Sequence, residues 1–510
     1  MTIDQVRARP VTAAPTREPF ATLPVLLVAA VVAALLVATS NRYGYHRDEL
    51  YFRLLGQHPA WGYVDQPPAT PLLAGLTRAL FGDHLWALRL PSALAVAGAA
   101  ILTALLVREW GGGRAAQVLG ALGVVAVFPL AGGHVLATAT LDLVLQAAVL
   151  LCVARALLRD PRWWLAAGAV VGAGLYVKYL VVLTLLAVGV GLLLAGPRRV
   201  LASRWLWAGV LLALVVGAPN LVYQATHHWP QLTMAGAIER NKGAGSRVSF
   251  LPLQLVMLGL FMVPVWVAGL VRLLREPGLR PVRAMAVAYP AACVLVLVLG
   301  GQPYYTLGLI LALYAAGCAP VVRWMARGQR VGRVGRIGRV AAFTTALVLN
   351  VAMSVLVALP LLPVRVLAAT HLADANQVVA DQIGWPEYVR QIADVYRGLP
   401  AADASRAVIV TANYGEAGAL DRFGTGLPPV HSAHNALWFL GRPAEDRTVV
   451  ILVGFADAGP RLAWFGSCRV AARLDNGVGI PNEEQSNDVK VCHDPVRPWS
   501  QLWPDLRHYD

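Results

Sequence analysis

Two adjacent carboxylates stand in the first long polar segment of the chain, where they could accept a proton. Asp48 and Glu49 belong to the stretch 43–52, which comes soon after an apolar run at 21–39. A carboxylate at the outer end of a helix bundle is partly desolvated, and partial desolvation suits it to serve as a general base. The alternative is a solvated loop carboxylate that pairs with Arg47, and both interpretations fit the residue types.

Two other polar residues interrupt apolar runs, and we expect both to reach the same face of the molecule as Asp48. Asp142 lies near one end of an apolar run, and Lys178 stands at the turn between two more. The chain has three lysines, so a lysine at this place is unusual for it. Its ammonium can bind a phosphate as a point charge. It can equally extend to the membrane surface while its stem stays in the apolar layer.

The composition predicts an integral membrane protein as the scaffold for these residues. Of the 510 residues, 57% are hydrophobic and 14% are charged, whereas soluble domains carry about 25% charged residues. Several apolar runs reach the roughly 20 residues that a helix needs to cross a bilayer. We predict about eleven spans, at 21–39, 86–107, 115–132, 138–158, 163–177, 179–195, 205–225, 250–273, 284–300, 305–322 and 340–361.

The charge distribution predicts how these spans are oriented. Residues 1–364 hold 30 Lys and Arg against 11 Asp and Glu, and much of the excess lies in short connections between apolar runs, among them the loop that contains Arg330. By the positive-inside rule these connections are cytoplasmic, and so is the polar tail 1–20. This distribution argues for membrane topology and against a nucleic-acid partner. An odd number of spans would then place the C-terminal region outside the cytoplasm.

The opposite side of the membrane collects acidic groups. Its predicted segments are 40–85, 226–249, the turn 301–305 and everything after about 362. Of nine acidic residues between 21 and 364, six map to this side. Carboxylates near a membrane are costly unless they are solvated or paired. Their gathering on one face therefore indicates a site there.

The fold class we expect is an α-helical multi-spanning transmembrane domain at 21–364 followed by an extracytoplasmic α/β domain at 365–510. In the latter, residues 376–397 suit an amphipathic helix. The predicted strands are 406–411, 448–453 and the weaker 488–492. If this domain is extracytoplasmic, a disulfide between Cys468 and Cys492 is compatible with its compartment.

In order and topology, residues 1–240 resemble the family 39-type glycosyltransferases of the GT-C fold. That group includes the dolichyl-phosphate-mannose protein mannosyltransferases and the bacterial lipid A aminoarabinose transferase. The features that carry the resemblance are Asp48 and Glu49 after the first span, the segment 65–68 with its Pro-Pro, the segment 88–91 at the second span, Asp142, and the segment 174–178.

The resemblance implies roles for these residues. Asp48, with Glu49 beside it, matches the proposed catalytic carboxylate, and Asp142 and Lys178 match an Asp and a Lys at the donor site. The family usually has an acidic residue and a Lys before its Pro-Pro, whereas this chain has an acidic residue and a Gln, so one phosphate contact is missing. The remaining candidates are Tyr45, Asp65, Gln66, Asp142 and Tyr176 for substrate binding, and Arg240 and Lys242 as further contacts to the donor phosphate.

The activity that the resemblance implies is an inverting transfer of a sugar from a polyprenyl-phosphate donor to a hydroxyl group. The acceptor would be a glycan, a lipid or a protein at the outer face of the cytoplasmic membrane. No nucleotide sugar is available there, and the sequence contains no Asp-x-Asp pair to hold one through a metal. The alternative is a transporter or lipid flippase, although no internal repeat is visible and the ionisable residues gather at one face instead of at mid-depth.

Two other groups of residues can each be interpreted in two ways. The set Asp65, Glu239, His227 and His228 could hold a divalent metal across two loops, although histidines beside a Trp-Pro pair also suit an anchor at the membrane interface. Loops that follow strands often bind ligands, so residues of two such segments could contact the acceptor or could instead cap turns. These residues are Asn413, Tyr414, Glu416, His434 and Asn435, in segments that resemble those of bacterial family 39-type proteins.

Overall fold

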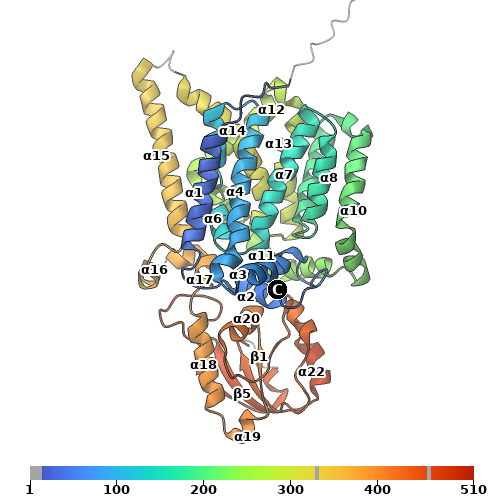
Figure 1. Cartoon of the computed structure of the whole chain (residues 1–510), viewed down its shortest axis with the longest axis vertical. Coiled ribbons are helices and arrows are strands. Elements are labelled where there is room, and N and C mark those ends of the chain that lie inside the picture. The colour runs from blue at the N-terminus through green and yellow to red at the C-terminus, as the bar shows by residue number, and fades with distance from the viewer. Residues whose placement is uncertain (1–13, 328–331, 371, 456–460) are drawn as a thin grey trace, which may run out of the picture.

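A bundle of long apolar helices forms one end of the molecule and a small α/β domain forms the other (Figure 1). The structure is a computed structural model that describes residues 14–327, 332–370, 372–455 and 461–510. Most of the predicted tail 1–20, and Arg330 of the predicted basic loop, lie outside the described residues. The helices of the bundle are α1 (Thr22–Thr39), α4 (Leu85–Glu109), α5 (Arg114–Leu122), α6 (Val127–His134), α7 (Thr138–Leu158), α8 (Trp163–Gly174), α9 (Leu180–Ala195), α10 (Arg204–Thr226), α12 (Val263–Arg275), α13 (Arg283–Leu299), α14 (Leu307–Ala326) and α15 (Gly332–Ala358).

The predicted helical membrane architecture is confirmed, but the number of eleven spans is not. Within the described residues, seven helices are long and apolar enough to cross a membrane, or up to nine if two bent helix pairs each count as one span. The bent pairs are α5 with α6, at 58°, and α11 with the segment 260–275, at 67°. The predicted spans at 163–177 and 179–195 became α8 and α9, which have 12 and 16 residues. Both fall short of the roughly 20 residues that a span requires.

Small residues bring the helices of the bundle into close contact. A Cβ atom added to Gly168 of α8 would lie 2.0 Å from the backbone oxygen of Gly209 in α10. The same holds between α12 and α14, where a Cβ at Gly269 would lie 1.7 Å from the Leu313 oxygen. In an apolar solvent helices associate mainly through such close van der Waals packing. Alanine and glycine in these runs therefore determine which helices are neighbours.

A layer of helices separates the bundle from the α/β domain (Figure 1). It contains α2 (Arg47–Leu55), α3 (Ala69–Phe81) and α11 (Pro230–Val256). The outer segment that we predicted at 226–249 is mostly helical, because α11 begins at Pro230 and extends into the predicted span at 250–273. Proline at the first position of α11 favours helix initiation, and Trp229 before it adopts a positive φ of 55° that turns the chain out of α10.

The α/β domain is built on a five-stranded mixed sheet with strand order β2-β1-β3-β5-β4. The three predicted strands correspond to β1 (Ala407–Thr411), β3 (Val449–Val453) and β5 (Asp488–Pro495). Two shorter or more exposed strands, β2 (Val430–Ser432) and β4 (Phe465–Arg473), were not predicted. β1 is parallel to both β2 and β3, whereas β5 is antiparallel to β3 and β4.

Helices cover both faces of this sheet. One face packs against α18 (Trp385–Arg397) and α20 (Tyr414–Phe423), and α22 (Trp499–Leu506) contributes Trp499 and Leu502 to the core on the other face. The predicted helix at 376–397 is split into α17 (Gln377–Ala380) and α18, because Gly384 takes a positive φ of 100° between them.

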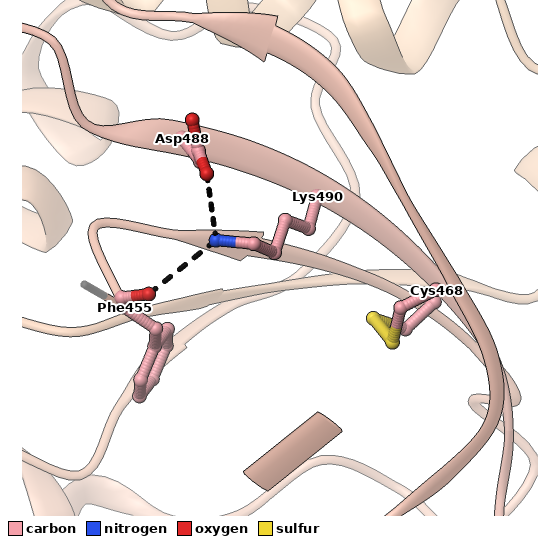
Figure 2. Close-up of a disulfide and its surroundings, with 5 residues drawn as sticks. Phe455, Cys468, Asp488 and Lys490 are labelled. Carbon is pink, nitrogen blue, oxygen red and sulfur yellow. Dashed lines mark hydrogen bonds and ion pairs between the residues drawn. A yellow bond between two sulfur atoms is a disulfide. The ribbon is translucent and has the colours of Figure 1, made fainter. Parts of the chain in front are cut away.

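A disulfide joins Cys468 of β4 to Cys492 of β5, where the two residues are register partners (Figure 2). On the same sheet, the Lys490 ammonium lies 3.1 Å from Asp488 and donates a hydrogen bond of 3.5 Å to the backbone oxygen of Phe455 (Figure 2). The two antiparallel strands are thus joined covalently at the edge of the sheet.

The α/β domain docks onto the helical layer chiefly through α20 against α2. Gly418 permits this approach, because a Cβ there would lie 2.7 Å from the Leu50 backbone oxygen. Ion pairs flank the contact: Arg47 of α2 pairs with Glu483, and Arg53 pairs with Asp83 and Asp421. The start of α20 is consequently held over the start of α2.

Candidate active site

A cavity of about 710 Å³ opens where the bundle, the helical layer and the α/β domain meet. Segments far apart in the sequence contribute to its wall. They include the start of α2, the turn between α8 and α9, the turn before α14, and residues of the α/β domain. The polar groups in the wall include Asp48, Asp65, Gln66, Lys178, Gln224, Gln231, Lys242, Gln302, Tyr304, Tyr305, Tyr414, Asn435 and Asp510.

Asp48 is presented to this cavity by the first turn of α2. The helix begins with a capping box, in which the His46 ring accepts from the Asp48 backbone N–H and Glu49 accepts from that of His46. This arrangement directs Asp48 outward, with 38% of its side chain exposed. Its Oδ1 accepts a hydrogen bond of 2.8 Å from the Tyr414 hydroxyl. Its Oδ2 accepts none from the residues that the structure describes.

Lys178 enters the same cavity from the turn between α8 and α9. Its ammonium donates to the Tyr304 hydroxyl at 3.2 Å and lies 5.1 and 5.2 Å from the ring centres of Tyr304 and Tyr305. No carboxylate of the described residues forms an ion pair with it. A cation that lies against two aromatic rings and has no ion pair among the described residues can bind an anionic ligand as a point charge.

Asp142 lies just behind this cation, near the start of α7. It is 1% exposed, receives a hydrogen bond from Gln146, and interacts electrostatically with Lys178. Its Oδ1 has no hydrogen-bond partner among the described residues. The structure therefore brings Asp142 close to Lys178, as predicted, but behind the cavity wall.

Asp65 and Gln66 lie together in the cavity wall, between α2 and α3. The Tyr51 hydroxyl donates to Asp65 at 2.9 Å and itself accepts from the Ala436 backbone N–H. Burial raises the pKa of Asp65 to about 7, with the charge of Asp48 adding to the rise. The cavity therefore holds one carboxyl that titrates near neutrality. Gln66 leaves its Oε1 without a partner among the described residues.

Glu49 does not face the cavity. It is fully buried, and its carboxylate accepts two hydrogen bonds from Arg89, at 2.9 and 2.8 Å. It also accepts the backbone N–H groups of His46 and Leu136. With both oxygens occupied, Glu49 joins α2 to α4 and α6. The residue types alone could not separate the roles of Asp48 and Glu49.

Two aromatic candidates point away from the cavity. The Tyr176 hydroxyl donates to the backbone oxygen of Val216 in α10, at 2.8 Å. Tyr45 packs in the core against Phe423, and its hydroxyl accepts from Arg422. Both therefore support the position of neighbouring elements, and neither is in reach of a ligand at Asp48.

The two basic candidates of α11 have different surroundings. Lys242 lines the cavity, 3.1 Å from the side chain of Asp510, whereas Arg240 is exposed outside it.

The four candidate metal ligands do not gather. Glu239 pairs with Arg247, and His227 stacks on Tyr223 with ring centres 4.0 Å apart. His228 is exposed, and Asp65 bonds Tyr51. The part of the chain that the structure describes contains no group of three or more His, Cys, Asp or Glu that could hold a metal ion.

The predicted acceptor segments stand at the carboxyl ends of β1 and β2, facing the bundle. Tyr414 and Asn435 line the cavity, while Asn413 and Glu416 form the capping box that starts α20. Burial raises the pKa of Glu416 to about 7. Burial also lowers the pKa of His434 well below its usual value, so this ring is neutral and accepts from the Tyr414 backbone N–H.

Several residues of the cavity were not singled out from the sequence. Tyr304 and Tyr305 were noted as part of a short turn, but the bond to Lys178 requires knowledge of how α14 packs. Asp510 stands far from any motif. The paired tyrosines after Gly300 and Gly301, on the acidic side of the membrane, were the signal that could have identified this turn as part of the site.

One side of the cavity is an apolar channel lined by two helices of the bundle and by one helix of the helical layer. It runs from the polar end at Lys178 along α9, α11 and α13. Its walls are formed by Val182, Leu183, Leu186, Met234, Ala235, Ile238, Leu295, Val296 and Leu299. A ligand that places a charged group at Lys178 would therefore lay an apolar portion along these helices.

The helical bundle, its layer of short helices and the appended α/β domain are the architecture of GT-C glycosyltransferases. ArnT from Cupriavidus metallidurans, whose crystal structure was determined bound to undecaprenyl phosphate, superposes with a TM-score of 0.58 at 17% identity, covering 92% of this chain and 97% of that one. The arabinofuranosyltransferase AftD from Mycobacteria superposes with a TM-score of 0.52 at 15% identity, covering 94% of this chain and 41% of that one.

A family model described as dolichyl-phosphate-mannose-protein mannosyltransferase matches residues 65–223 of the sequence. No curated protein sequence matches the chain. The resemblance to family 39-type glycosyltransferases, and the GT-C fold that it implied, are confirmed by these findings. Together they support glycosyl transfer in general terms.

Proposed function

We propose that this protein transfers a sugar from a polyprenyl-phosphate donor to a hydroxyl acceptor, with inversion at the anomeric carbon. The observation that carries the proposal is the meeting of Asp48 and Lys178 in one cavity, with an apolar channel leading from it. The carboxylate matches an acceptor hydroxyl, and the cation, which has no ion pair among the described residues, matches a phosphate. The long apolar wall matches a polyprenyl chain.

The chemistry needs no further protein group. The acceptor oxygen attacks the anomeric carbon, its proton passes to Asp48, and the bond between the anomeric carbon and the phosphate oxygen breaks. The electron pair of that bond leaves with the phosphate, whose charge Lys178 stabilises. Attack opposite the leaving group inverts the anomeric centre.

We place this reaction at the outer face of the cytoplasmic membrane, with the α/β domain extracytoplasmic. Two observations support the placement. The Arg-rich connection between α12 and α13 lies at the end of the bundle opposite the α/β domain (Figure 1), and basic connections favour the cytoplasm. The α/β domain also carries a disulfide, which persists in oxidising compartments.

The donor sugar is a hexose or a pentose, and the acceptor is a glycan, lipid or protein of the cell envelope. ArnT supports the lipid carrier, because its structure holds undecaprenyl phosphate. AftD supports glycosyl transfer as the type of reaction, because it is described as an arabinofuranosyltransferase.

The test is transfer by the purified full-length chain in lipid nanodiscs. Polyprenyl phosphates carrying mannose, arabinose or galactose serve as donors, a cell-envelope extract provides acceptors, and released polyprenyl phosphate is measured. We expect Asp48→Asn to lower release by about 100-fold or more, because the general base is lost, while expression and thermal unfolding stay unchanged. Full activity of Asp48→Asn would rule out the base role. In sealed proteoliposomes, movement of intact donor across the bilayer without release would favour a flippase.

A further inference from the structure

A phenol from the α/β domain holds the carboxylate of α2. Tyr414, the first residue of α20, donates its hydroxyl to Asp48 Oδ1 at 2.8 Å across 366 residues of sequence. Burial and the negative charge of Asp48 hold the pKa of Tyr414 well above its usual value. The phenol therefore keeps its proton and donates a hydrogen bond to the ionised carboxylate.

The orientation of Tyr414 is set by neighbours on both domains. Its ring stacks on Tyr51 of α2, with centres 4.5 Å apart, and on His434, with centres 4.8 Å apart. His434 in turn stacks on His508 at 4.7 Å. The Arg47 guanidinium lies 5.0 Å from the Tyr414 ring centre. A column of four rings thus extends from the helical layer into the α/β domain, with Tyr414 inside it.

The bond leaves one oxygen of Asp48 for chemistry. Oδ1 is occupied by Tyr414, while the Nδ1 atom of the His46 ring lies 4.0 Å from Oδ2. His46 uses its Nδ1 to cap α2, so it does not donate a proton to the carboxylate from that atom. Oδ2 is therefore the oxygen that has no donor among the described residues, on a side chain that lines the cavity.

From this geometry we infer that Tyr414 is a positioning residue for Asp48, so that the α/β domain completes the site of proton transfer. This inference rests on the proposed function of Asp48. The phenol fixes the carboxylate rotamer, occupies Oδ1 and aims Oδ2 at the acceptor hydroxyl.

The test is Tyr414→Phe in the full-length chain, which keeps the ring column and removes the hydroxyl alone. With the sugar donor that the wild-type chain turns over, we expect kcat to fall about tenfold or more, while the KM for the donor stays within about twofold because Lys178 is untouched. In the infrared spectrum, with Asp48→Asn to identify the band, the carboxylate band of Asp48 should shift, because its Oδ1 loses a hydrogen bond.

Tyr388→Phe is the matched control. Tyr388 also lies in the α/β domain and donates its hydroxyl, to Asn482 at 2.8 Å, but on α18 and away from the cavity. Its removal should leave kcat and the Asp48 infrared band unchanged. Wild-type kcat and an unmoved Asp48 band in Tyr414→Phe would overturn the inference, even if Asp48→Asn is inactive. An active Asp48→Asn would instead overturn the proposed function, and the Asp48 band would still decide whether Tyr414 holds this carboxylate.

Discussion

Neighbouring residues of similar chemistry serve different purposes in this protein. Asp48 and Glu49 are adjacent in α2, yet successive residues of a helix point about 100° apart. Glu49 therefore turns into the bundle, where Arg89 neutralises it, while Asp48 turns to the cavity. The two basic residues of the cavity differ in a similar way. Lys178 has aromatic neighbours and no ion pair among the described residues, whereas Lys242 already pairs with Asp510.

This difference predicts unequal effects of removing the two lysine charges. Lys178→Met should raise the Kd for undecaprenyl phosphate and the KM for the sugar donor by about tenfold or more, because the phosphate loses its point charge. Lys242→Met should change both by less than about threefold, since its charge is already compensated. The measurements are binding of labelled undecaprenyl phosphate in nanodiscs and donor-dependent release kinetics. Equal effects of the two variants would contradict the assignment of Lys178 to the phosphate.

The site is assembled by a contact between two helices, α2 and α20. The start of α2 holds Asp48 and the start of α20 holds Tyr414, so the relative position of these helices sets the distance between the two side chains. Gly418 allows α20 to rest against the backbone of α2 at Leu50. Buried carboxyl groups lie in the same region of the α/β domain. Among them are Glu416 and Glu484, and burial raises the pKa of each to about 7. The packing of Gly418 against Leu50 therefore controls the contact between Tyr414 and Asp48, because Tyr414 lies one turn earlier in α20.

Gly418→Leu should consequently separate the two helices and lower transfer. A side chain there meets backbone atoms of Leu50 that cannot move aside, so α20 must shift and Tyr414 must leave Asp48. We expect kcat to fall by about tenfold or more, with donor binding retained. Gly466→Ala is the control, since the nearest atom to its added Cβ is Asp494 Cβ at 3.5 Å, an ordinary contact. Unchanged kcat in Gly418→Leu would show that the docking of α20 does not set the activity.

The two ends of the molecule differ in charge and in structure. Arg-rich connections lie at one end of the bundle, and the cavity and the α/β domain lie at the other (Figure 1). A donor lipid in the bilayer would enter along the apolar channel, while an acceptor would approach between the helical layer and the α/β domain. Function therefore depends on which end faces outward.

The orientation can be tested with single cysteines and a membrane-impermeant maleimide. Asp446→Cys replaces a side chain of the α/β domain that is 79% exposed, and it should be labelled in intact cells. Arg280→Cys, in the connection between α12 and α13, should be labelled after permeabilisation alone. The parent chain is the control, because Cys152 and Cys318 are buried and Cys293 is partly buried. The reverse pattern would place the cavity at the cytoplasmic face.

Much of the architecture follows from local properties of the sequence. Hydrophobicity and charge act residue by residue, so apolar runs predicted where the helices form, and the acidic side of the chain predicted where the cavity opens. The β-branched runs predicted β1 and β3, because a buried strand needs a continuous apolar stretch. The short strand β2 and the exposed strand β4 lack that signal.

The tertiary structure decided what depends on contacts between distant segments. The sequence indicated Asp48 and Lys178, but their shared cavity depends on how α2 packs near the turn between α8 and α9. Glu49 became structural because Arg89 of α4 reaches it, and Tyr414 became part of the site because α20 docks on α2. The number of spans likewise depends on helix bends and lengths. Such contacts join residues tens to hundreds of positions apart, and no local pattern records which of them will meet.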